Sequence, residues 1–436
     1  MLNQSNVTVE SKPAETALTT SHSTHTIPAA WQTPLPSRTE IIPQLENIGM
    51  TTPANDHPEK ITLQNLARKT KIIATLGPAS ASGDILHSLV EAGVSVFRLN
   101  LACISRESAL KAVFGIRTIS ADLQRPVSLL LDTQFSPTST AGSPAISESD
   151  WADLRFGLEC GVDWLAVSAD HNSDAVRQLR QFLAEQNRSN ISILARIQDP
   201  APRATLDQII QDADGIILDS GKLADESPEG KVSSAWQLIW QQIVQKCISA
   251  RKLAVITTDE NVDMAATLFS KPDALLLTKE TSIGSNPLQS VQTLDGLIKR
   301  EESRHGREAS ATVLLTTEQD QVVAAAVQQA NGMQAEGIVV MTRTEHSAAL
   351  CAALRPLHAR VFVFTPDARL ARRVRLRYAL ETVVLPFSEK PKANLRDAKK
   401  LLLERKLLPP GAKVVWLSDP LSQEPLASSV SVSELA

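Results

Sequence analysis

Four polar residues and a glycine lie at the ends of two apolar runs in the middle of the chain, where they could act together on a small molecule. Arg196 and Gln198 end the run ISILARIQ, and Ser220, Gly221 and Lys222 follow the run GIIL. The residues between the runs, ATLDQIIQDA, have the periodicity of a helix. Strand, helix and strand form a βαβ unit, and α/β proteins place their reactive groups just past the strand ends. We therefore expect these side chains to share one rim.

The elements that position this rim repeat the same pattern over residues 69–300. Apolar runs alternate with amphipathic helical segments, and the runs lie at 71–77, 94–100, 126–132, 162–168, 191–198, 215–218, 253–258 and 272–278. Eight strands, each followed by a helix, predict an α/β fold of the (β/α)8 TIM barrel type, whose working groups lie at the strand C-termini.

Five more apolar runs follow at 311–317, 337–342, 360–366, 381–386 and 413–419, and they predict a smaller C-terminal α/β domain. The first 56 residues are rich in Ser, Thr, Pro and Ala and lack apolar periodicity, which is typical of a disordered N-terminal leader. We divide the chain into a leader at 1–60, a barrel at 61–305 and a C-terminal domain at 306–436.

The bulk composition is that of an ordinary globular protein, with 43% hydrophobic and 21% charged residues among 436. A net charge of -4 argues against partners such as nucleic acid or an acidic membrane surface. No apolar run reaches the roughly 18 residues of a membrane span, and no secretory signal is evident. Four cysteines without a CxxC pair predict buried thiols in a reducing compartment, so we expect a cytoplasmic protein.

An arginine-rich segment, RLARRVRLRYAL at 369–380, is predicted to be a helix of the C-terminal domain. Its basic residues are Arg369, Arg372, Arg373, Arg375 and Arg377. A nucleic-acid face is conceivable, but no aromatic platform accompanies it. We therefore favour a solvated helix whose arginines pair with acidic neighbours.

Several of these runs, taken together and in order, resemble the pyruvate kinase family. The matching motifs are RKTKIIATLGPAS, EAGVSVFRLN, PVSLLLDT, DLRFGLECGVDWLAVS, ARI, DGIIL and KETSIGSNP, and the resemblance runs from about Arg68 to Pro420. It implies a barrel with a lid domain inserted after the third strand, followed by a C-terminal α/β domain. It also implies phosphoryl transfer from phosphoenolpyruvate to ADP, with Mg²⁺ and K⁺ as cofactors if activity is retained.

The lid that the resemblance implies has no room in this sequence. Only Phe135 to Ile146, FSPTSTAGSPAI, separate the third strand from the next helix. Twelve residues cannot form a domain that excludes water, and phosphoryl transfer from an enol phosphate needs a closed, water-poor site.

The catalytic positions that the resemblance implies are also changed. It places the metal-binding Glu and Asp at Gln198 and Lys222, the catalytic Lys at Arg196, the proton-relay Thr at Asp259, and a Ser and a His at Ala102 and Cys103. Hard divalent ions need carboxylate oxygens. A guanidinium keeps the lysine's charge but differs in reach and geometry. No catalytic or metal set is therefore intact, and we expect no cofactor.

Charge arithmetic on these positions argues against a metal ion. Arg196, Gln198 and Lys222 sum to +2, or to +1 with Asp259, where the family's residues sum to -1. At ~5 Å and an effective dielectric constant of ~20, each added positive charge costs a divalent ion about 6 to 7 kcal/mol.

Some family positions persist, namely Arg98, Asn100, Asp132, Thr133, Glu280 and Thr281. By the resemblance, the first of them touch phosphoryl and potassium sites, so they could retain ligand binding. The alternative is that they form structural hydrogen bonds between strand ends. Two alternatives are likewise open for Lys222. It could form a salt bridge with Asp219, Asp225 or Asp259, or it could bind an anion.

The family's effector loop, which holds a phosphorylated ligand with hydroxyls and a glycine, corresponds to IVVMTRTEHSAAL at 338–350. Thr342, Thr344 and Ser347 remain, but Glu345 stands at the glycine position and adds bulk and negative charge. Arg343 or His346 could partly offset that charge.

We therefore predict a pyruvate kinase-like pseudoenzyme that acts by binding a small anion or another protein. One alternative is a diverged pyruvate kinase, or a metal-free enzyme acting on a small phosphorylated or carboxylated anion. Another is a homo-oligomer, or a hetero-oligomer with an authentic pyruvate kinase.

Overall fold

The computed structural model describes residues 68–133, 148–169, 173–198, 203–219, 234–258, 267–268, 270–305, 312–418 and 429–435. The predicted leader, the segment Phe135 to Ile146, and the positions Ser220, Gly221, Lys222 and Asp259 lie outside these ranges. None of the helices within them is long and apolar enough to cross a membrane.

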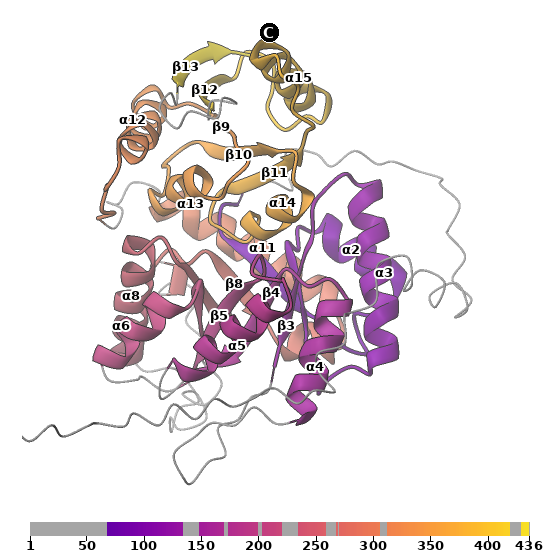
Figure 1. The fold of residues 1–436 in the computed structure, drawn as a ribbon. Coiled ribbons are helices and arrows are strands. Elements are labelled where there is room, and N and C mark those ends of the chain that lie inside the picture. Colours follow the sequence, from indigo (N-terminus) through magenta and orange to yellow (C-terminus); the bar gives the residue numbers. More distant parts are fainter. Residues whose placement is uncertain are drawn as a thin grey trace, which may run out of the picture. The chain divides into compact units, whose positions relative to one another are not determined.

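Eight parallel strands close into a barrel in chain order, as the sequence predicted (Figure 1). The strands are β1 (Lys71–Thr75), β2 (Val96–Leu99), β3 (Ser128–Asp132), β4 (Trp164–Ser168), β5 (Ser192–Ile197), β6 (Gly215–Leu218), β7 (Leu253–Thr258) and β8 (Ala274–Leu277). Pairing of β1 with β8, in which Lys71 lies opposite Ala274, completes the ring.

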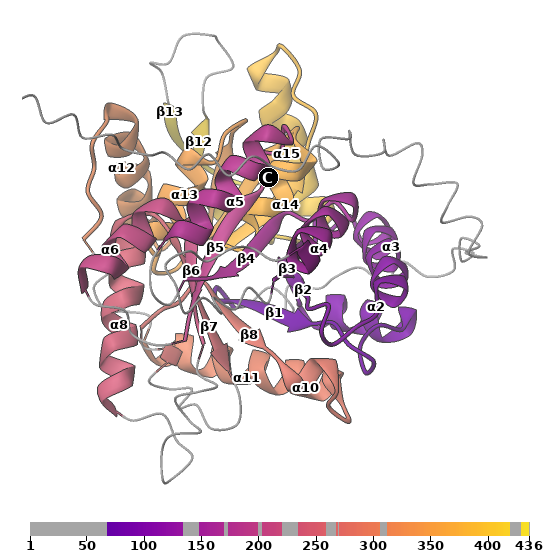
Figure 2. The same cartoon turned by 60° about the horizontal axis from the view of Figure 1, so that its bottom comes forward.

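Helices surround these strands, as Figure 2 shows. They are α2 (Gly83–Glu91), α3 (Arg106–Asp122), α4 (Glu148–Glu159), α5 (Asp174–Glu185), α6 (Arg203–Asp212), α8 (Ser234–Ser249), α10 (Lys279–Ser282) and α11 (Pro287–His305). With both faces covered, the strands are built from continuous Ile, Leu and Val runs rather than an alternating pattern.

One glycine is needed where two barrel strands approach closely. A Cβ atom at Gly215, the first residue of β6, would lie 2.5 Å from the Leu253 Cβ and 2.8 Å from the Leu253 carbonyl oxygen. Any larger residue would push β6 away from β7, so the sequence DGIIL fixes the position of this strand pair.

The C-terminal domain is a five-stranded sheet in the order β11, β10, β9, β12, β13. Its strands are β9 (Gly337–Met341), β10 (Arg360–Thr365), β11 (Leu380–Val384), β12 (Lys413–Ser418) and the antiparallel β13 (Ser429–Glu434). Its helices are α12 (Glu318–Met333), α13 (His346–Ala353), α14 (Ala368–Val374) and α15 (Pro391–Glu404). Alternate strand residues join two cores, one with α12, α13 and α14 and one with α15.

The predicted strand at 311–317 is wrong, because residues 312–317 form no strand and the fifth strand is β13. The backbone groups of this segment form hydrogen bonds with side chains and not with a neighbouring strand. The amides of Thr316 and Thr317 donate to the Asp320 carboxylate at the start of α12, and the Leu314 carbonyl accepts from Arg251. Leu314 is 71% exposed, so its apolar side chain does not mark a buried strand here.

The predicted solvated arginine helix is also wrong in part. Helix α14 ends at Val374, and Arg375 and Arg377 beyond it are buried, with 1% and 7% exposure. The expected acidic partners are present, because Arg372 pairs with Asp163 of the barrel at 2.9 Å. The segment joins the two domains instead of facing solvent.

Leu376 extends this junction into the barrel. It is fully buried and belongs to the core cluster of β-strand residues that includes Ile73, Trp164 and Leu276. The backbone amide of Ala379 donates to the Lys69 carbonyl just before β1. The turn after α14 therefore packs against the end of the barrel where the strands begin.

The thiols largely follow the sequence prediction. Cys160, Cys247 and Cys351 are buried, whereas Cys103 is half-buried. Burial raises the pKa of each buried thiol to about 12, so these three side chains are inert core residues.

Replacement of Leu376 by Ala should lower the free energy of unfolding by about 2 to 5 kcal/mol, because it leaves a cavity at the base of the barrel. Urea denaturation measures this loss. Leu314→Ala is the control and should change stability by less than about 0.5 kcal/mol, since that leucine is 71% exposed. Equal effects of the two substitutions would contradict the packing of Leu376 in the barrel core.

Candidate functional site at the carboxyl ends of the barrel strands

One carboxylate, that of Asp132 at the end of β3, is shared by two arginines at the barrel mouth. Arg98 of β2 donates to its Oδ2 atom from Nε at 2.7 Å and from Nη2 at 2.6 Å. Arg196 of β5 donates to its Oδ1 atom from Nη1 at 2.8 Å. The Asp132 side chain is only 1% exposed, and those of the two arginines about a tenth. The three form a buried ion triad with a charge of +1.

The two guanidinium groups differ in how fully they are satisfied. Nη1 of Arg98 also donates to the Thr75 hydroxyl at 3.3 Å, and Nη2 of Arg196 to the Thr133 carbonyl at 3.4 Å. The Thr133 hydroxyl donates to the Ala166 carbonyl on β4. Nε of Arg196 is buried and has no hydrogen-bond partner among the described residues. One donor of the arginine at the family's catalytic-lysine position therefore remains available.

A second polar group spans the ends of β5, β6 and β7. Nε2 of Gln198 donates to Oδ2 of Asp219 at 3.3 Å, and the Thr257 hydroxyl lies 3.3 Å from Oδ1 of the same carboxylate. The sequence prediction considered Asp219 only as a partner of Lys222. Its position directly after the GIIL run was the available signal that it lies at the mouth.

Three other retained positions make hydrogen bonds with the backbone amides of this protein. Oδ1 of Asn100 accepts from the amide of Ala102, and Oε2 of Glu280 accepts from the amide of Thr278. The Thr281 hydroxyl accepts from the amide of Thr75 at 2.9 Å, which ties α10 to β1. These contacts are structural hydrogen bonds, which was one of the two alternatives for these positions; the other was ligand binding.

The described residues give a different charge sum from the sequence. Arg98 and Arg196 contribute +2, and Asp132 and Asp219 contribute -2, so the four sum to zero. The sequence-based value of +2 covered a different set, because it included Lys222, which lies outside the described residues, and left out Arg98 and both aspartates. The two arginines at the mouth are thus balanced in charge by two carboxylates. The arginines themselves contact Asp132, and the neighbouring Gln198 contacts Asp219.

The retained hydroxyls of the effector loop are bound within the protein. The Thr342 hydroxyl donates to the Thr344 carbonyl and accepts from the Thr344 amide, each at 3.1 Å. The Ser347 hydroxyl accepts from Nε2 of Gln319 at 3.1 Å, and His346 contacts Asp320 at 2.8 Å. Arg343 stacks over the Phe387 ring.

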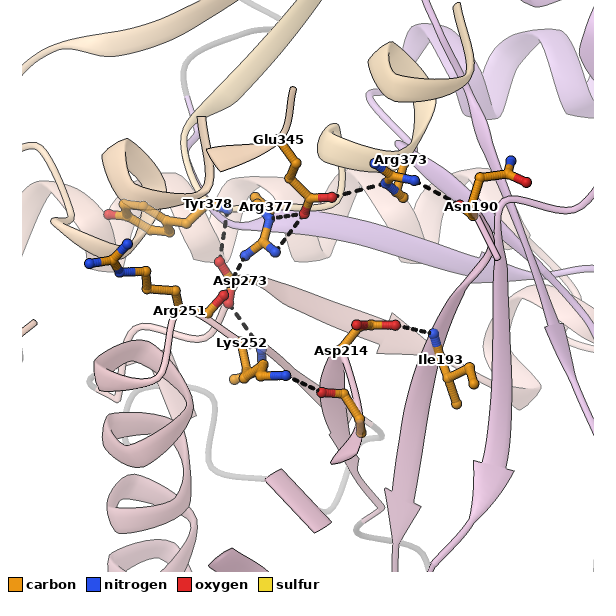
Figure 3. A network of polar contacts seen from close by, with 12 residues as sticks. Asn190, Ile193, Asp214, Arg251, Lys252, Asp273, Glu345, Arg373, Arg377 and Tyr378 are labelled. Carbon is orange, nitrogen blue, oxygen red and sulfur yellow. Dashed lines mark hydrogen bonds and ion pairs between the residues drawn. The ribbon is translucent and has the colours of Figure 1, made fainter. Parts of the chain in front are cut away.

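Glu345 does not simply add negative charge to this loop, because it binds two arginines of the segment after β10 (Figure 3). It accepts from Nε of Arg373 at 2.9 Å and from Nη2 of Arg377 at 2.6 Å. The same arginines donate to barrel carbonyls, Arg373 to that of Asn190 and Arg377 to that of Arg251. Burial alone would raise the pKa of Glu345, but Arg377 and Arg373 outweigh it and lower the pKa.

The comparisons with known proteins agree with this architecture. The family description "Pyruvate kinase, barrel domain" matches residues 67–141 and 135–291, and "Pyruvate kinase, alpha/beta domain" matches residues 320–425. The chain belongs to the pyruvate kinase family. The two stretches of the barrel match meet at 135–141, in the segment that follows β3.

Similar proteins within the pyruvate kinase family come from plants and bacteria. Pyruvate kinase isozyme A, chloroplastic, of Nicotiana tabacum is 29% identical over 64% of this chain and 50% of its own length. The pyruvate kinase of Methylorubrum extorquens is 23% identical over 78% of this chain and 91% of its own. The chain spans about half the length of the isozyme A proteins of Nicotiana tabacum and Ricinus communis that it matches.

Replacement of Asp132 by Asn should destabilise the protein by about 3 to 5 kcal/mol, because two buried guanidinium groups lose their shared counter-charge. Urea denaturation measures the change. Asp153→Asn is the matched control, since Asp153 pairs with a 52% exposed Arg106 and its loss should cost at most about 1 kcal/mol. Similar losses of stability in both variants would contradict the prediction that the Asp132 triad stabilises the fold more than the exposed Asp153–Arg106 pair does.

The lowered pKa of Glu345 makes its contribution to stability depend on pH. The group's ordinary pKa is 4.5, so the contribution is present above that value and is lost as pH falls through the lowered folded-state pKa. Denaturation of wild type and Glu345→Gln should therefore differ most near neutral pH and converge in acid. Glu404→Gln, at an exposed pair with Lys400, should stay close to wild type throughout. A gap that widens in acid would contradict the assignment.

Proposed function

We propose that this pyruvate kinase-like protein has lost phosphoryl transfer and acts by binding a small anion or another protein. The observation that carries the proposal is the ion triad, in which both carboxylate oxygens of Asp132 accept from arginines. A phosphoryl-transfer site needs cationic groups free to meet the charge that develops on the phosphate. Here these cations are already paired with a protein carboxylate.

The residues at the metal positions support the same proposal. Gln198 offers an amide where the family resemblance implies a carboxylate, and its Nε2 atom donates to Asp219. Asp219 itself is one carboxylate, held by Gln198 and Thr257. A divalent ion bound through substrate phosphates usually takes one or two carboxylates. Asp132 is held by two arginines, and Asp219 is held by Gln198 and Thr257, so both described carboxylates at the mouth are engaged within the protein. We therefore expect no Mg²⁺ or K⁺ to be needed.

The short connection after β3 is further support. β3 ends at Asp132 and α4 begins at Glu148, which leaves no length for an inserted lid domain. Without a lid, water would compete with ADP for the phosphoryl group of an enol phosphate.

A second candidate, residual binding or turnover of a phosphorylated or carboxylated anion, is favoured by one observation. Nε of Arg196 is buried and without a partner among the described residues. An anion could accept from this donor without displacing Asp132. Such a diverged enzyme would act without a metal or as a weak pyruvate kinase.

We propose a homo-oligomer, or a hetero-oligomer with an authentic pyruvate kinase, in the cytoplasm. Co-purification of the full chain from its native cell tests the partner, and imaging of a tagged full chain tests the location. Some relatives are named as chloroplastic, so a plastid signal would overturn the location but not the loss of activity.

The proposal predicts no ADP-dependent formation of pyruvate by the purified protein in a coupled assay. A rate that disappears in Arg196→Ala would refute it. Titration calorimetry with phosphoenolpyruvate, with and without Mg²⁺, separates the remaining readings. Heat that requires Mg²⁺ supports an enzyme, heat independent of Mg²⁺ supports an anion-binding protein, and no heat supports a protein scaffold.

Matched variants sharpen this titration. If an anion binds at the mouth, Arg196→Met should abolish the heat, because it removes the available Nε donor. Arg106→Met removes an exposed arginine of the same barrel and should leave the heat unchanged. Loss of heat in both variants would indicate nonspecific attraction of the anion.

A further inference from the structure

A second buried charge cluster lies at the opposite end of the barrel, where the strands begin. Oε1 of Glu381 in β11 accepts from Nζ of Lys71, the first residue of β1, at 2.9 Å. Oε2 of Glu381 pairs with Nη1 of Arg375 at 2.9 Å. The Lys71 and Arg375 side chains are 1% exposed, and that of Glu381 is 9% exposed. The cluster joins the barrel to the C-terminal domain.

Arg125, which precedes β3, adds a third cation to this cluster. It is 6% exposed, and its Nη1 atom donates to the Val90 carbonyl at 2.9 Å. Burial and the nearby charge of Arg375 lower its pKa to about 9. Burial likewise lowers the pKa of Lys71 to about 8. Both groups therefore still carry their protons at pH 7.

The other carboxylates around the cluster already pair with other groups. Asp295 pairs with Arg68 at 2.8 Å and with Lys299 at 2.6 Å. Glu302 accepts from the amides of Lys69 and Thr70. Glu381 alone is thus shared by Lys71 and Arg375, and Arg125 contacts no carboxylate among the described residues. A buried charge without a partner is unfavourable, because it has lost its hydration and gained no counter-charge.

Unpartnered donors in the cluster indicate where a counter-charge would sit. Nε and Nη2 of Arg375 are buried and have no hydrogen-bond partner in the described part of the chain, and neither has Nε of Arg125. Nε and Nη2 lie on one edge of the planar guanidinium, the arrangement that binds anions through two parallel N–H groups. Nη1 of Arg375 is already engaged with Glu381, so the unpartnered Nε and Nη2 edge is not the one that binds this carboxylate.

We propose that a small inorganic anion of the chloride type binds the Nε and Nη2 edge of Arg375 at the base of the barrel. It offsets the excess positive charge of Lys71, Arg125 and Arg375 over Glu381. Because Arg375 belongs to the C-terminal domain and Lys71 and Arg125 to the barrel, the anion stabilises the contact between the two. This site is separate from the mouth and does not depend on the proposed function.

Thermal unfolding of the full chain tests the site when chloride replaces gluconate at constant ionic strength. An anion that binds only the folded protein raises the unfolding midpoint with the logarithm of its concentration above the dissociation constant. Wild type should show this rise. Arg125→Gln should lose it, because the variant removes one excess charge but leaves the Lys71–Glu381–Arg375 contacts in place.

The matched control is Arg343→Gln, which removes an exposed arginine of the C-terminal domain and should keep the wild-type rise. A crystal grown with bromide gives a readout that needs no variant. An anomalous peak at hydrogen-bond distance from Nε and Nη2 of Arg375 is the expected result. A wild-type midpoint that ignores the identity of the anion, or a bromide crystal with only water at this edge, would overturn the proposal.

Discussion

The sharing of Asp132 between Arg98 and Arg196 is the interaction that decides what the barrel mouth offers. It joins the ends of β2, β3 and β5 through one buried carboxylate. Removing the carboxylate would leave two guanidinium groups uncompensated in a site of low dielectric constant. The arginines are therefore held by the protein itself. A ligand at this mouth would meet cations that are already partly neutralised, and the proposed loss of phosphoryl transfer rests on this pairing.

A different set of ion pairs holds the C-terminal domain against the barrel. Arg372 contacts Asp163 and Arg355 contacts Asp273, each at 2.9 Å across the two domains. Glu345 binds Arg373 and Arg377 within the C-terminal domain, and these two arginines donate to barrel carbonyls. Leu376 adds an apolar contact inside the barrel. Glu345, which stands at the glycine position of the family's effector loop, thus takes part in joining the domains. The Glu345 carboxylate forms hydrogen bonds with both Arg373 and Arg377.

The sequence predicted the fold well, because β-branched runs and helix periodicity are local signals. The eight barrel strands and four of the five C-terminal strands lie where these signals placed them. The run at 311–317 misled the prediction, since Asp320 and Arg251 take up its backbone groups. The weakly apolar β13, SVSVSE, owes its strand to pairing with β12, which no local pattern reveals.

The site was less predictable, because its contacts join residues far apart in sequence. The identities of Arg98, Asp132 and Arg196 could be read from the family resemblance, but not their mutual pairing. The burial of Arg377 was missed for the same reason, because its partner Glu345 lies 32 residues away. Arg375 pairs with the nearby Glu381, but its burial depends on the contact with the distant Lys71 side of the barrel. The charge sum taken from the sequence did not include Asp132 and Asp219, whose contacts with Arg98, Arg196 and Gln198 only the structure shows.

We propose that this barrel mouth does not hold a divalent ion, and electron paramagnetic resonance of Mn²⁺ tests this proposal. Free aqueous Mn²⁺ gives a six-line spectrum that weakens when the ion binds a protein. The wild-type chain should leave the spectrum unchanged, with or without phosphoenolpyruvate. A loss of free signal that saturates at one ion per chain, and that Mg²⁺ reverses, would contradict it.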